Sequence, residues 1–491
     1  MKKGDVIEDI VVERMAAEGK CVSRINGLVI FLEGGAPGDT VDVMLTKIKS
    51  SFLEGRITSI KKWSPDRSKP FCIHFGTCGG CSWQHIPYEK QLEYKQQQAI
   101  DHLERIGGLV LPAITPIIGS GKTRFYRNKL DYTFSARRWL TREEFAAKKE
   151  LTFENEIGKE LPPEPALGYH IPRKFDLIFD VKICHLQADP SDAIRLAVKD
   201  EALKNNISFF ELRQQIGFLR TLTIRTANTG EVMIILQVTE DKMEWTEKIL
   251  QRLERDFPKI TSFHYVINSK KNDTFSDLNI ICWKGNPYIT ERMPKPDGKG
   301  ELQFRVGPKS FYQTNSDQAH ELYKIAFGMA RLKGDELVYD LYTGTGTIAN
   351  FIASQAKKVI GLEYVSAAIE DAKENSKINN ITNTEFYAGD MKDLLNDRFL
   401  SENGRPDVII TDPPRAGMHQ DVCNMLLKAE PEKIVYVSCN TATQARDLAI
   451  LSPKYVIKAV QPVDMFPHTI HVENVVALEK RPEGITDGIE N

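Results

Sequence analysis

Long apolar runs are absent from this sequence of 491 residues, and none approaches the roughly 20 residues that a membrane-spanning helix requires. The segment Met1–Asp5 leads into a charged strand pattern and lacks the apolar core of a signal peptide. Internal repeats and low-complexity tracts are missing too. We therefore expect a cytoplasmic protein that makes no membrane contact.

An excess of charge of one sign is also missing, because 65 Lys and Arg residues oppose 67 Asp and Glu residues, for a net charge of −2. This balance excludes a polycation that binds nucleic acid through charge alone. Basic residues nevertheless gather within 47–69 and within 122–138. Such clusters can hold phosphates, although a solvated charged face gives the same pattern.

Cysteines are few, with eight in the whole chain, and a cytoplasmic chain of this length is not expected to form disulfides. Three of them, Cys72, Cys78 and Cys81, are spaced closely enough to wrap one metal centre, and Cys184 is the expected fourth ligand. Four thiolates suit either tetrahedral zinc or an iron–sulfur cluster. The spacing alone does not distinguish the two.

The length predicts two or three domains, because single hydrophobic cores rarely grow beyond roughly 250–300 residues. Residues 1–60 alternate short strands with Gly and Pro turns, which is typical of a small β-barrel. Residues 61–310 hold the cysteines and mostly strand-like runs. A polar helix over 88–106 lies within this range but is expected to pack on the C-terminal domain, residues 311–482. The charged and then proline-punctuated stretch 139–165 predicts a helix and a long surface loop.

From 311 to 482, helices alternate with apolar strands, which indicates a doubly wound, Rossmann-like α/β sheet. Residues 483–491 are polar and are expected to form a flexible tail. The predicted fold is thus multidomain: an N-terminal β-barrel, a central mostly-β domain with the cysteine site, and a C-terminal α/β domain. The seven strands expected in the last domain are Leu337–Tyr342, Val359–Glu363, Thr384–Ala388, Val408–Thr411, Ile434–Ser438, Tyr455–Val460 and Val475–Leu478.

A glycine-containing loop, Asp340–Gly346, ends the first of these strands and opens a helix. Gly344 and Gly346 let the backbone pass close under a bound nucleoside. Glu363 ends the next strand about twenty residues later, where an acidic side chain meets ribose hydroxyls in a dinucleotide fold. Asp390 follows the third strand, where it can reach an adenine edge.

NAD is the competing ligand for such a loop, and a plain tight turn is the structural alternative. The third glycine of the dinucleotide pattern is missing, because position 349 is alanine. A nucleophilic residue also lies downstream, which hydride transfer does not need. We therefore predict that the loop binds S-adenosylmethionine.

The nucleophile is Cys439, which follows the strand Ile434–Ser438, while Asp412 and Arg415 follow the preceding strand. Ligands of open α/β sheets bind beyond the carboxyl ends of strands, so these side chains are expected to face one crevice. Addition of a thiolate to C6 of a pyrimidine turns C5 into an enolate carbon that can attack a sulfonium methyl group. The alternative for Cys439 is a buried structural thiol.

A base must then remove the C5 proton so that the thiolate can leave. Glu473 is the predicted base, and His468 and His471 are alternative bases. Arg415 bears on the target: cytosine C5 methylases commonly place their cysteine after a Pro-Pro pair, where this chain has arginine. Amino-group methylases use an Asp-Pro-Pro-aromatic motif without a cysteine. Uracil is therefore favoured over cytosine and adenine.

The sequence resembles the RNA uracil-C5 methyltransferase family over nearly its whole length, and in particular the 23S ribosomal RNA branch. The motifs that carry the resemblance are Phe311–Asn315, Asp340–Gly346, Asp412–Arg415, Ser438–Asn440 and Pro467–Glu473. One departure is Thr343, where the family often has cysteine. The loop binds mainly through its backbone, so we expect this change to matter little.

The resemblance implies roles for further residues. Gln313 would lie at the junction of the methyl donor and the flipped base, and Phe311 would stack on that base. Tyr342, Glu363 and Asp412 would contact the donor or the base. Family members with this cysteine pattern carry a [4Fe–4S] cluster, which favours iron–sulfur over zinc and implies a structural role for the four cysteines.

The N-terminal barrel resembles a TRAM domain, a small RNA-binding module, and such barrels bind RNA through basic loops and exposed aromatic rings. Arg127 and Lys129 lie in a run that interleaves aromatic and basic residues, which predicts an RNA contact. The target base must leave its stack to reach Cys439.

The leading hypothesis is a monomeric enzyme that makes 5-methyluridine in 23S ribosomal RNA with S-adenosylmethionine. The first alternative is the same chemistry on the T-loop of transfer RNA. The second is an RNA-binding protein that has kept an inactive methylase fold, which the intact Cys439 and Glu473 argue against.

Overall fold

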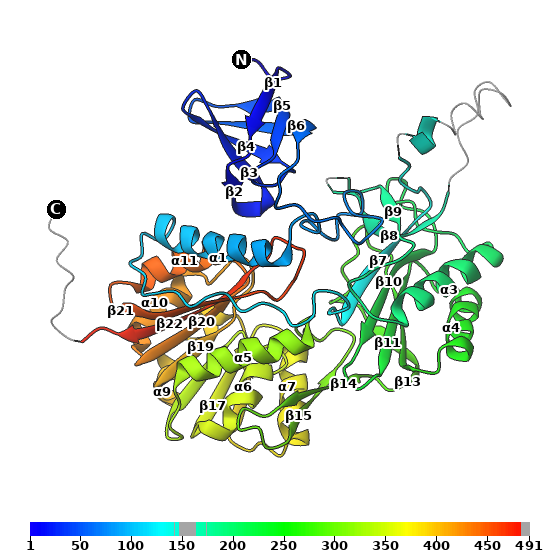
Figure 1. Cartoon of the computed structure of the whole chain (residues 1–491). Coiled ribbons are helices and arrows are strands. Elements are labelled where there is room, and N and C mark those ends of the chain that lie inside the picture. The colour runs from blue at the N-terminus through cyan, green and yellow to red at the C-terminus, as the bar shows by residue number, and fades with distance from the viewer. Residues whose placement is uncertain (142, 147–163, 173, 483–491) are drawn as a thin grey trace.

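The computed structural model describes residues 1–141, 143–146, 164–172 and 174–482. Most of the predicted 139–165 insertion and the predicted tail 483–491 lie outside these residues. Figure 1 shows a small N-terminal β domain, a central β domain with helices on one side, and a C-terminal α/β domain. None of the described helices is both long enough and apolar enough to cross a membrane.

The N-terminal domain is a six-stranded sheet in the order β1-β5-β6-β4-β3-β2. Alternate residues of β5 are buried, so one face of that strand packs on a core that includes Ile30, Leu32 and Val43. Asp39 fixes the exit of the chain, since its buried carboxylate accepts two hydrogen bonds from Arg67 at 2.8 and 2.6 Å. The strands are β1 (Val6–Val11), β2 (Arg14–Met15), β3 (Cys21–Ile25), β4 (Leu28–Glu33), β5 (Thr40–Ile48) and β6 (Phe52–Lys62).

The central domain is built on a seven-stranded sheet in the order β13-β12-β11-β10-β7-β8-β9. The strand-like run from Gln215 to Arg225 becomes strand β10 only from Leu219, because Gln215 adopts a left-handed conformation and the chain turns there. The sequence analysis also missed helix α3 (Ser191–Lys204). The other elements are α4 (Met243–Asp256), β7 (Lys129–Ser135), β8 (Ala166–His170), β9 (Ile178–Asp180), β10 (Leu219–Thr226), β11 (Val232–Val238), β12 (Ile260–Ile267) and β13 (Ile280–Gly285).

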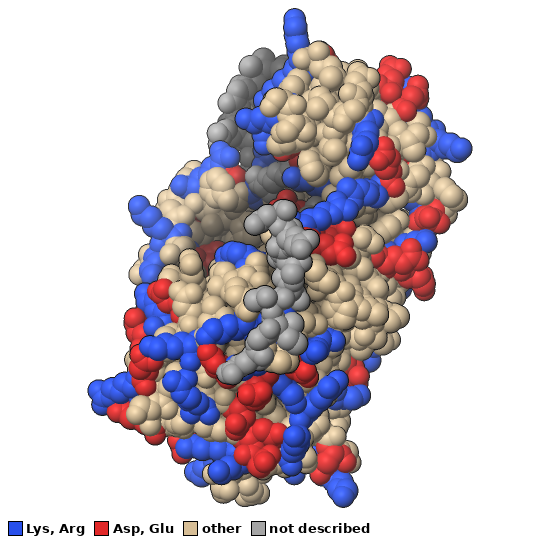
Figure 2. Space-filling view, turned by 90° about the vertical axis from the view of Figure 1, so that its left-hand side faces the viewer, with Lys and Arg blue, Asp and Glu red and all other residues tan. Residues whose placement is uncertain are grey.

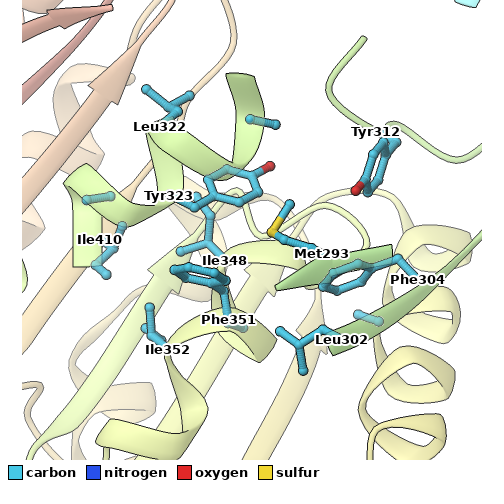
Figure 3. Packing of buried hydrophobic residues seen from close by; sticks show 14 of the residues in the cluster. Met293, Leu302, Phe304, Tyr312, Leu322, Tyr323, Ile348, Phe351, Ile352 and Ile410 are labelled. Atoms are coloured by element: carbon cyan, nitrogen blue, oxygen red, sulfur yellow. The ribbon is translucent and has the colours of Figure 1, made fainter. Parts of the chain in front are cut away.

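The hairpin of β14 (Ile289–Pro294) and β15 (Glu301–Val306) lies within the range predicted for the central domain but packs on the C-terminal domain. Figure 3 shows Met293, Leu302 and Phe304 of this hairpin beside the helices of the C-terminal domain. The C-terminal domain therefore includes residues that precede position 311.

The C-terminal domain contains a seven-stranded sheet in the order β18-β17-β16-β19-β20-β22-β21. Six of its strands point in the same direction, and β22, which lies between β20 and β21, runs antiparallel to both of these neighbours. The order reverses at β16, so the switch point of the sheet lies where the predicted donor loop begins. The strands are β16 (Leu337–Leu341), β17 (Lys358–Glu363), β18 (Thr384–Ala388), β19 (Val408–Thr411), β20 (Lys433–Ser438), β21 (Tyr455–Val463) and β22 (Glu473–Lys480).

Helices cover both faces of this sheet (Figure 1). Helix α1 (Tyr88–Arg105) precedes the central domain in the chain yet packs against α11 and β21 of the C-terminal domain. Its buried residues are Gln91, Lys95, Ala99 and Leu103, which form one stripe at a spacing of four. The helices of the domain itself are α5 (Ser316–Ala330), α6 (Thr347–Ile352), α7 (Ser366–Ile378), α8 (Met391–Leu394), α9 (Asp397–Asn403), α10 (Gln420–Ala429) and α11 (Thr441–Leu451).

Candidate active site

The predicted donor loop connects β16 to α6 through three residues in the left-handed conformation: Tyr342, Gly344 and Gly346, with φ of +63°, +57° and +74°. A Cβ atom on Gly346 would approach side chains of Ala372, Asn350 and Phe386 to 2.9–3.1 Å, so glycine is required there. No atom lies within 4 Å of the corresponding position on Gly344, which leaves its surface open.

The two acidic residues predicted to contact the donor stand beside this loop. Glu363 ends β17, and its carboxylate accepts hydrogen bonds from the backbone N–H groups of Gly344 at 3.1 Å and Val365 at 2.9 Å. Asp390 follows β18 and caps α8 by accepting a hydrogen bond from the N–H of Lys392 at 3.2 Å. The loop and both carboxylates thus share the carboxyl edge of three adjacent strands.

Cys439 and Glu473 are brought together by the pairing of β20 with β22. Ser438 pairs with Asn474 in antiparallel register, so the next residue on each strand, Cys439 and Glu473, lies across from the other. Burial and the charges of Glu473 and Asp412 raise the pKa of the Cys439 thiol to about 11, while Arg415 lowers it. The thiol therefore needs a nearby base, or relief from those negative charges, to become a nucleophile.

Burial and the charge of Asp412 raise the pKa of Glu473 to about 8, and Arg415 opposes this shift. Burial, followed by the charge of Asp340, raises the pKa of Asp412 to about 7. Two carboxyls whose pKa values lie near neutrality can take up and release protons at physiological pH. Gln313 donates a hydrogen bond to Asp412 at 3.4 Å, which joins the Phe311–Asn315 segment to the site.

The two alternative bases have other partners. His468 contacts Gln91 of α1 through Nδ1 at 3.1 Å, and His471 contacts Arg415 at 2.9 Å. Burial lowers the pKa of each imidazole to about 4, so neither is suited to hold a proton near neutral pH. Among the three predicted bases, the carboxyl of Glu473 has the pKa closest to neutrality.

Adjacent aromatic residues of the Phe311–Asn315 segment point in different directions. Phe311 is 64% exposed, whereas Tyr312 is buried and lies beside Phe304, with ring centroids 6.2 Å apart (Figure 3). Asn128 donates a hydrogen bond to the carbonyl of Gln313 at 2.8 Å and thereby ties the central domain to this segment. An exposed ring at the edge of a nucleophile site can stack on an extruded base.

Part of the basic clusters forms ion pairs with acidic residues, and part contacts aromatic rings. Lys129 lies 3.1 Å from Asp131, and Arg127 stacks over the ring of Phe466, 5.0 Å from its centroid. Figure 2 shows basic and acidic side chains interspersed on one face of the molecule rather than separated by sign. Of the two predicted RNA contacts, Arg127 therefore lies beside the loop that leads to Glu473, while Lys129 lies on the central sheet.

The four predicted metal ligands, Cys72, Cys78, Cys81 and Cys184, line one cavity between the segment before α1 and the central sheet. Much of its wall is apolar, including Tyr169, Val181 and Leu186. Among the described residues, no three His, Cys, Asp or Glu side chains converge closely enough to hold a single metal ion.

The structure adds residues that the sequence analysis did not single out. The buried Asp340 accepts hydrogen bonds from Thr343 and from the N–H of Ala349, and burial raises its pKa to about 7. Tyr323 of α5 is buried beneath the site. An acidic residue at the end of a strand was a visible signal for Asp340. The position of Tyr323 had no comparable signal.

Comparisons with known proteins agree with this arrangement. The sequence profile of the tRNA (uracil-5-)-methyltransferase family matches residues 200–481, and the profile of the TRAM domain matches residues 2–58. A solved structure, the tRNA (uracil-54, C5)-methyltransferase of Pyrococcus abyssi in complex with S-adenosyl-L-homocysteine, superposes with a TM-score of 0.70 at 26% identity. The similarity covers 95% of this chain and 99% of that one.

Two relatives are described as uncharacterized RNA methyltransferases. The protein from Bacteroides thetaiotaomicron is 55% identical over 95% of this chain and 100% of its own length. The protein from Porphyromonas gingivalis is 52% identical over 96% and 99%. With its TRAM domain and its methyltransferase domain, the chain belongs to the family of S-adenosylmethionine-dependent RNA uracil-C5 methyltransferases.

Proposed function

We propose that the protein methylates C5 of a uridine in 23S ribosomal RNA, with Cys439 as nucleophile and Glu473 as base. The observation that carries this proposal is the strand register that sets Cys439 across from Glu473 beside the donor loop. Asp412 stands next to both, since its charge raises the pKa of each.

The reaction follows from these positions. The Cys439 thiolate adds to C6 of the uracil, and the electron pair moves to C5. C5 then takes the methyl group, which S-adenosylmethionine supplies on a sulfonium, and S-adenosylhomocysteine leaves. Glu473 removes the C5 proton, the C5–C6 double bond re-forms, and the C6–S bond breaks to release the thiolate. The exposed ring of Phe311 stacks on the extruded base and offsets part of the lost base stacking.

The donor is held by the loop at Tyr342, Gly344 and Gly346 and by the acidic side chains of Glu363 and Asp390. We assign Gln313 and Asp412 to the junction of donor and base, as the family resemblance implies, and their mutual hydrogen bond supports a shared place in the site. Arg127 contributes to RNA binding near the base, and Lys129 does so farther along the central sheet. We propose that the enzyme acts as a monomer in the cytoplasm.

A T-loop uridine of transfer RNA is the second candidate substrate. It is favoured by the likeness to the Pyrococcus abyssi transfer RNA enzyme, which extends over 99% of that chain. The four-cysteine cavity and the resemblance to the ribosomal RNA branch favour 23S ribosomal RNA. An inactive RNA-binding protein is disfavoured, because the proposed nucleophile Cys439 and the proposed base Glu473 are both present.

We also propose that Cys72, Cys78, Cys81 and Cys184 bind a [4Fe–4S] cluster with a structural role. Their placement around one mostly apolar cavity supports this cluster. Anaerobically purified protein should contain about four irons per chain. Cys184→Ala should lose this iron and Cys282→Ala, which changes an exposed cysteine, should keep it. Iron-free wild-type protein that folds normally would contradict the assignment.

The substrate is tested by nucleoside mass spectrometry. Anaerobically purified protein is incubated with S-adenosylmethionine and unmodified 23S ribosomal RNA or transfer RNA. We expect 5-methyluridine in ribosomal RNA only. Product in transfer RNA only would retain the chemistry and reject the substrate. Cys439→Ala should abolish the product and retain RNA binding, while the matched Cys282→Ala should methylate normally; product from Cys439→Ala would reject the covalent mechanism.

A further inference from the structure

The loop Asp464–His471, which we call the base loop, joins β21 to β22 and leads directly to Glu473. Its two ends are fixed to each other, because Val463 pairs with Glu473 across β21 and β22. Strand pairing thus fixes the backbone of Glu473, and the loop reaches the site a second time through His471, which lies 2.9 Å from Arg415. Arg415 in turn lowers the pKa of Glu473 and of Cys439, so the conformation of the loop bears on the surroundings of the base. Many of the groups that hold this shape come from outside the C-terminal sheet.

The first attachment is a buried ion pair. The side chains of Lys95 in α1 and Asp464 are both 0% exposed, with Nζ 2.7 Å from Oδ1. Lys95 also donates to the carbonyl of Phe466 at 3.0 Å, and Tyr88 donates to the other oxygen of Asp464 at 2.8 Å. One end of the base loop is thus held by two side chains of α1.

The second attachment is at His468, whose φ of +63° is uncommon for a residue with a side chain. Gln91 of α1 accepts a hydrogen bond from the N–H of His468 at 2.8 Å and contacts its Nδ1 at 3.1 Å. The N–H groups of Ser82 and Trp83, which directly follow Cys81, donate to the His468 carbonyl at 2.8 and 3.0 Å. His468 is therefore hydrogen-bonded both to helix α1 and to the segment that carries Cys72, Cys78 and Cys81.

Burying Lys95 and Gln91 in place of apolar side chains does not favour stability. A buried ion pair commonly contributes less than well-packed apolar residues of similar size would, because both charges lose their hydration. Its recognised use is to select one arrangement among several. Both residues lie on the buried stripe of α1, and both direct their polar atoms to the base loop.

We propose that Lys95 and Gln91 are positioning residues for Glu473, so that helix α1 sets the rate at which the C5 proton is removed. The inference rests on the proposed function, in which Glu473 is the base. It predicts a defect in one step: the methylated Cys439–RNA adduct should form normally and then persist, because its release requires the proton to leave C5.

The test is a single-turnover experiment with radiolabelled RNA, in which the covalent adduct is resolved on a denaturing gel. Lys95→Met removes the buried positive charge that pairs with Asp464 in the base loop. The matched control is Lys90→Met, which makes the same change on the same helix at an exposed ion pair with Glu93. We expect Lys95→Met to slow adduct decay at least tenfold, with adduct formation and the KM for RNA within twofold of wild type. Lys90→Met should match wild type throughout.

Lys95→Met leaves Asp464 buried without its partner, which can prevent folding. Gln91→Met leaves no buried charge unpaired. It removes both contacts with His468, together with the hydrogen bonds that Gln91 Nε2 donates to the carbonyls of Trp83 and Ile86 at 3.0 and 2.8 Å, and it should show the same persistent adduct. If both folded variants slow formation and decay equally, or slow neither, the positioning role is rejected.

Glu473→Gln separates the two proposals: if it accumulates adduct while Gln91→Met does not, only the positioning role fails. If Glu473→Gln accumulates none, the assignment of Glu473 as base fails first.

Discussion

The raised pKa of Glu473 predicts a steep pH dependence for the release of methylated RNA from Cys439. Only the ionised carboxylate can accept the C5 proton. Because burial and the charge of Asp412 raise its pKa from an ordinary 4.5 to about 8, Glu473 is mostly protonated below that pH. The rate of adduct decay should therefore rise with pH and level off above about pH 9.

The size of the effect distinguishes a perturbed carboxyl from an ordinary one. A group with a pKa of about 8 is ionised in roughly 1% of molecules at pH 6 and in about half at pH 8. Decay should thus accelerate roughly 50-fold between these two pH values. A carboxyl with a pKa of 4.5 would be almost fully ionised throughout, and the rate would change by less than roughly 5%.

Substitutions of the two charged neighbours of Glu473, Asp412 and Arg415, should shift the pH profile of adduct decay in opposite directions. Asp412→Asn removes a negative charge that raises the pKa of Glu473, so its profile should shift to lower pH. The shift should be largest above pH 7, because the pKa of Asp412 itself is about 7. Arg415→Gln removes a positive charge and should shift the profile to higher pH.

The assay mixes enzyme and RNA at one pH, allows the methylated adduct to form, and follows its decay after a jump to each test pH. Decay that is independent of pH between 6 and 8 would refute the proposed environment of Glu473. Shifts of the same sign in Asp412→Asn and Arg415→Gln would refute the electrostatic explanation, even if the wild-type profile were steep.

Three further predictions concern stability and binding. The buried carboxylate of Glu473 destabilises the folded state most above its folded pKa of about 8, and this cost vanishes below about pH 4.5. Glu473→Gln should therefore raise Tm by at least about 2 °C at pH 8.5 and progressively less toward pH 5 in differential scanning calorimetry. An equal gain at both pH values would contradict this. Phe311→Ala should weaken RNA binding roughly 5- to 160-fold in a filter-binding assay, because stacking contributes about 1–3 kcal/mol per base. It should not change Tm, because the ring is exposed. Gly346→Ala should abolish binding of S-adenosylhomocysteine in calorimetric titration, because its methyl group would crowd neighbouring side chains. Gly344→Ala meets no neighbour and should weaken binding only about 5- to 30-fold, which corresponds to about 1–2 kcal/mol for an alanine in the left-handed conformation. Equal losses would show that crowding at Gly346 is unimportant.

The C-terminal strands could be predicted closely because each is a short, buried apolar run between loops. The strand Thr384–Ala388 has the predicted bounds, and β16 and β17 differ from prediction by one residue at one end. Helix α3 was missed because its pattern contradicts its burial: Leu196 and Leu203 are each 45% exposed, while Arg195 is fully buried. An amphipathic pattern cannot identify a helix whose buried face carries a charge.

Cys439 and Glu473 could be singled out because each lies in a distinctive motif, and their chemical roles stay predictions. Their exact facing positions required the antiparallel register of β20 and β22, which the sequence does not specify. The role of α1 was beyond prediction for a different reason. Gln91 and Lys95 resemble the solvent face of a polar helix, and their partners lie more than 360 residues away.

The pairing of Lys95 with Asp464 also has a consequence for biosynthesis. The two residues are 369 positions apart in the chain. At roughly 5–20 residues per second, a ribosome needs roughly 20–70 s to add Asp464 after Lys95. During that interval the buried stripe of α1 has neither its ion-pair partner nor the sheet on which it packs. If α1 positions the proposed base, this long-range contact must close before the site is complete, so the N-terminal and C-terminal halves should not acquire activity as separately folded pieces.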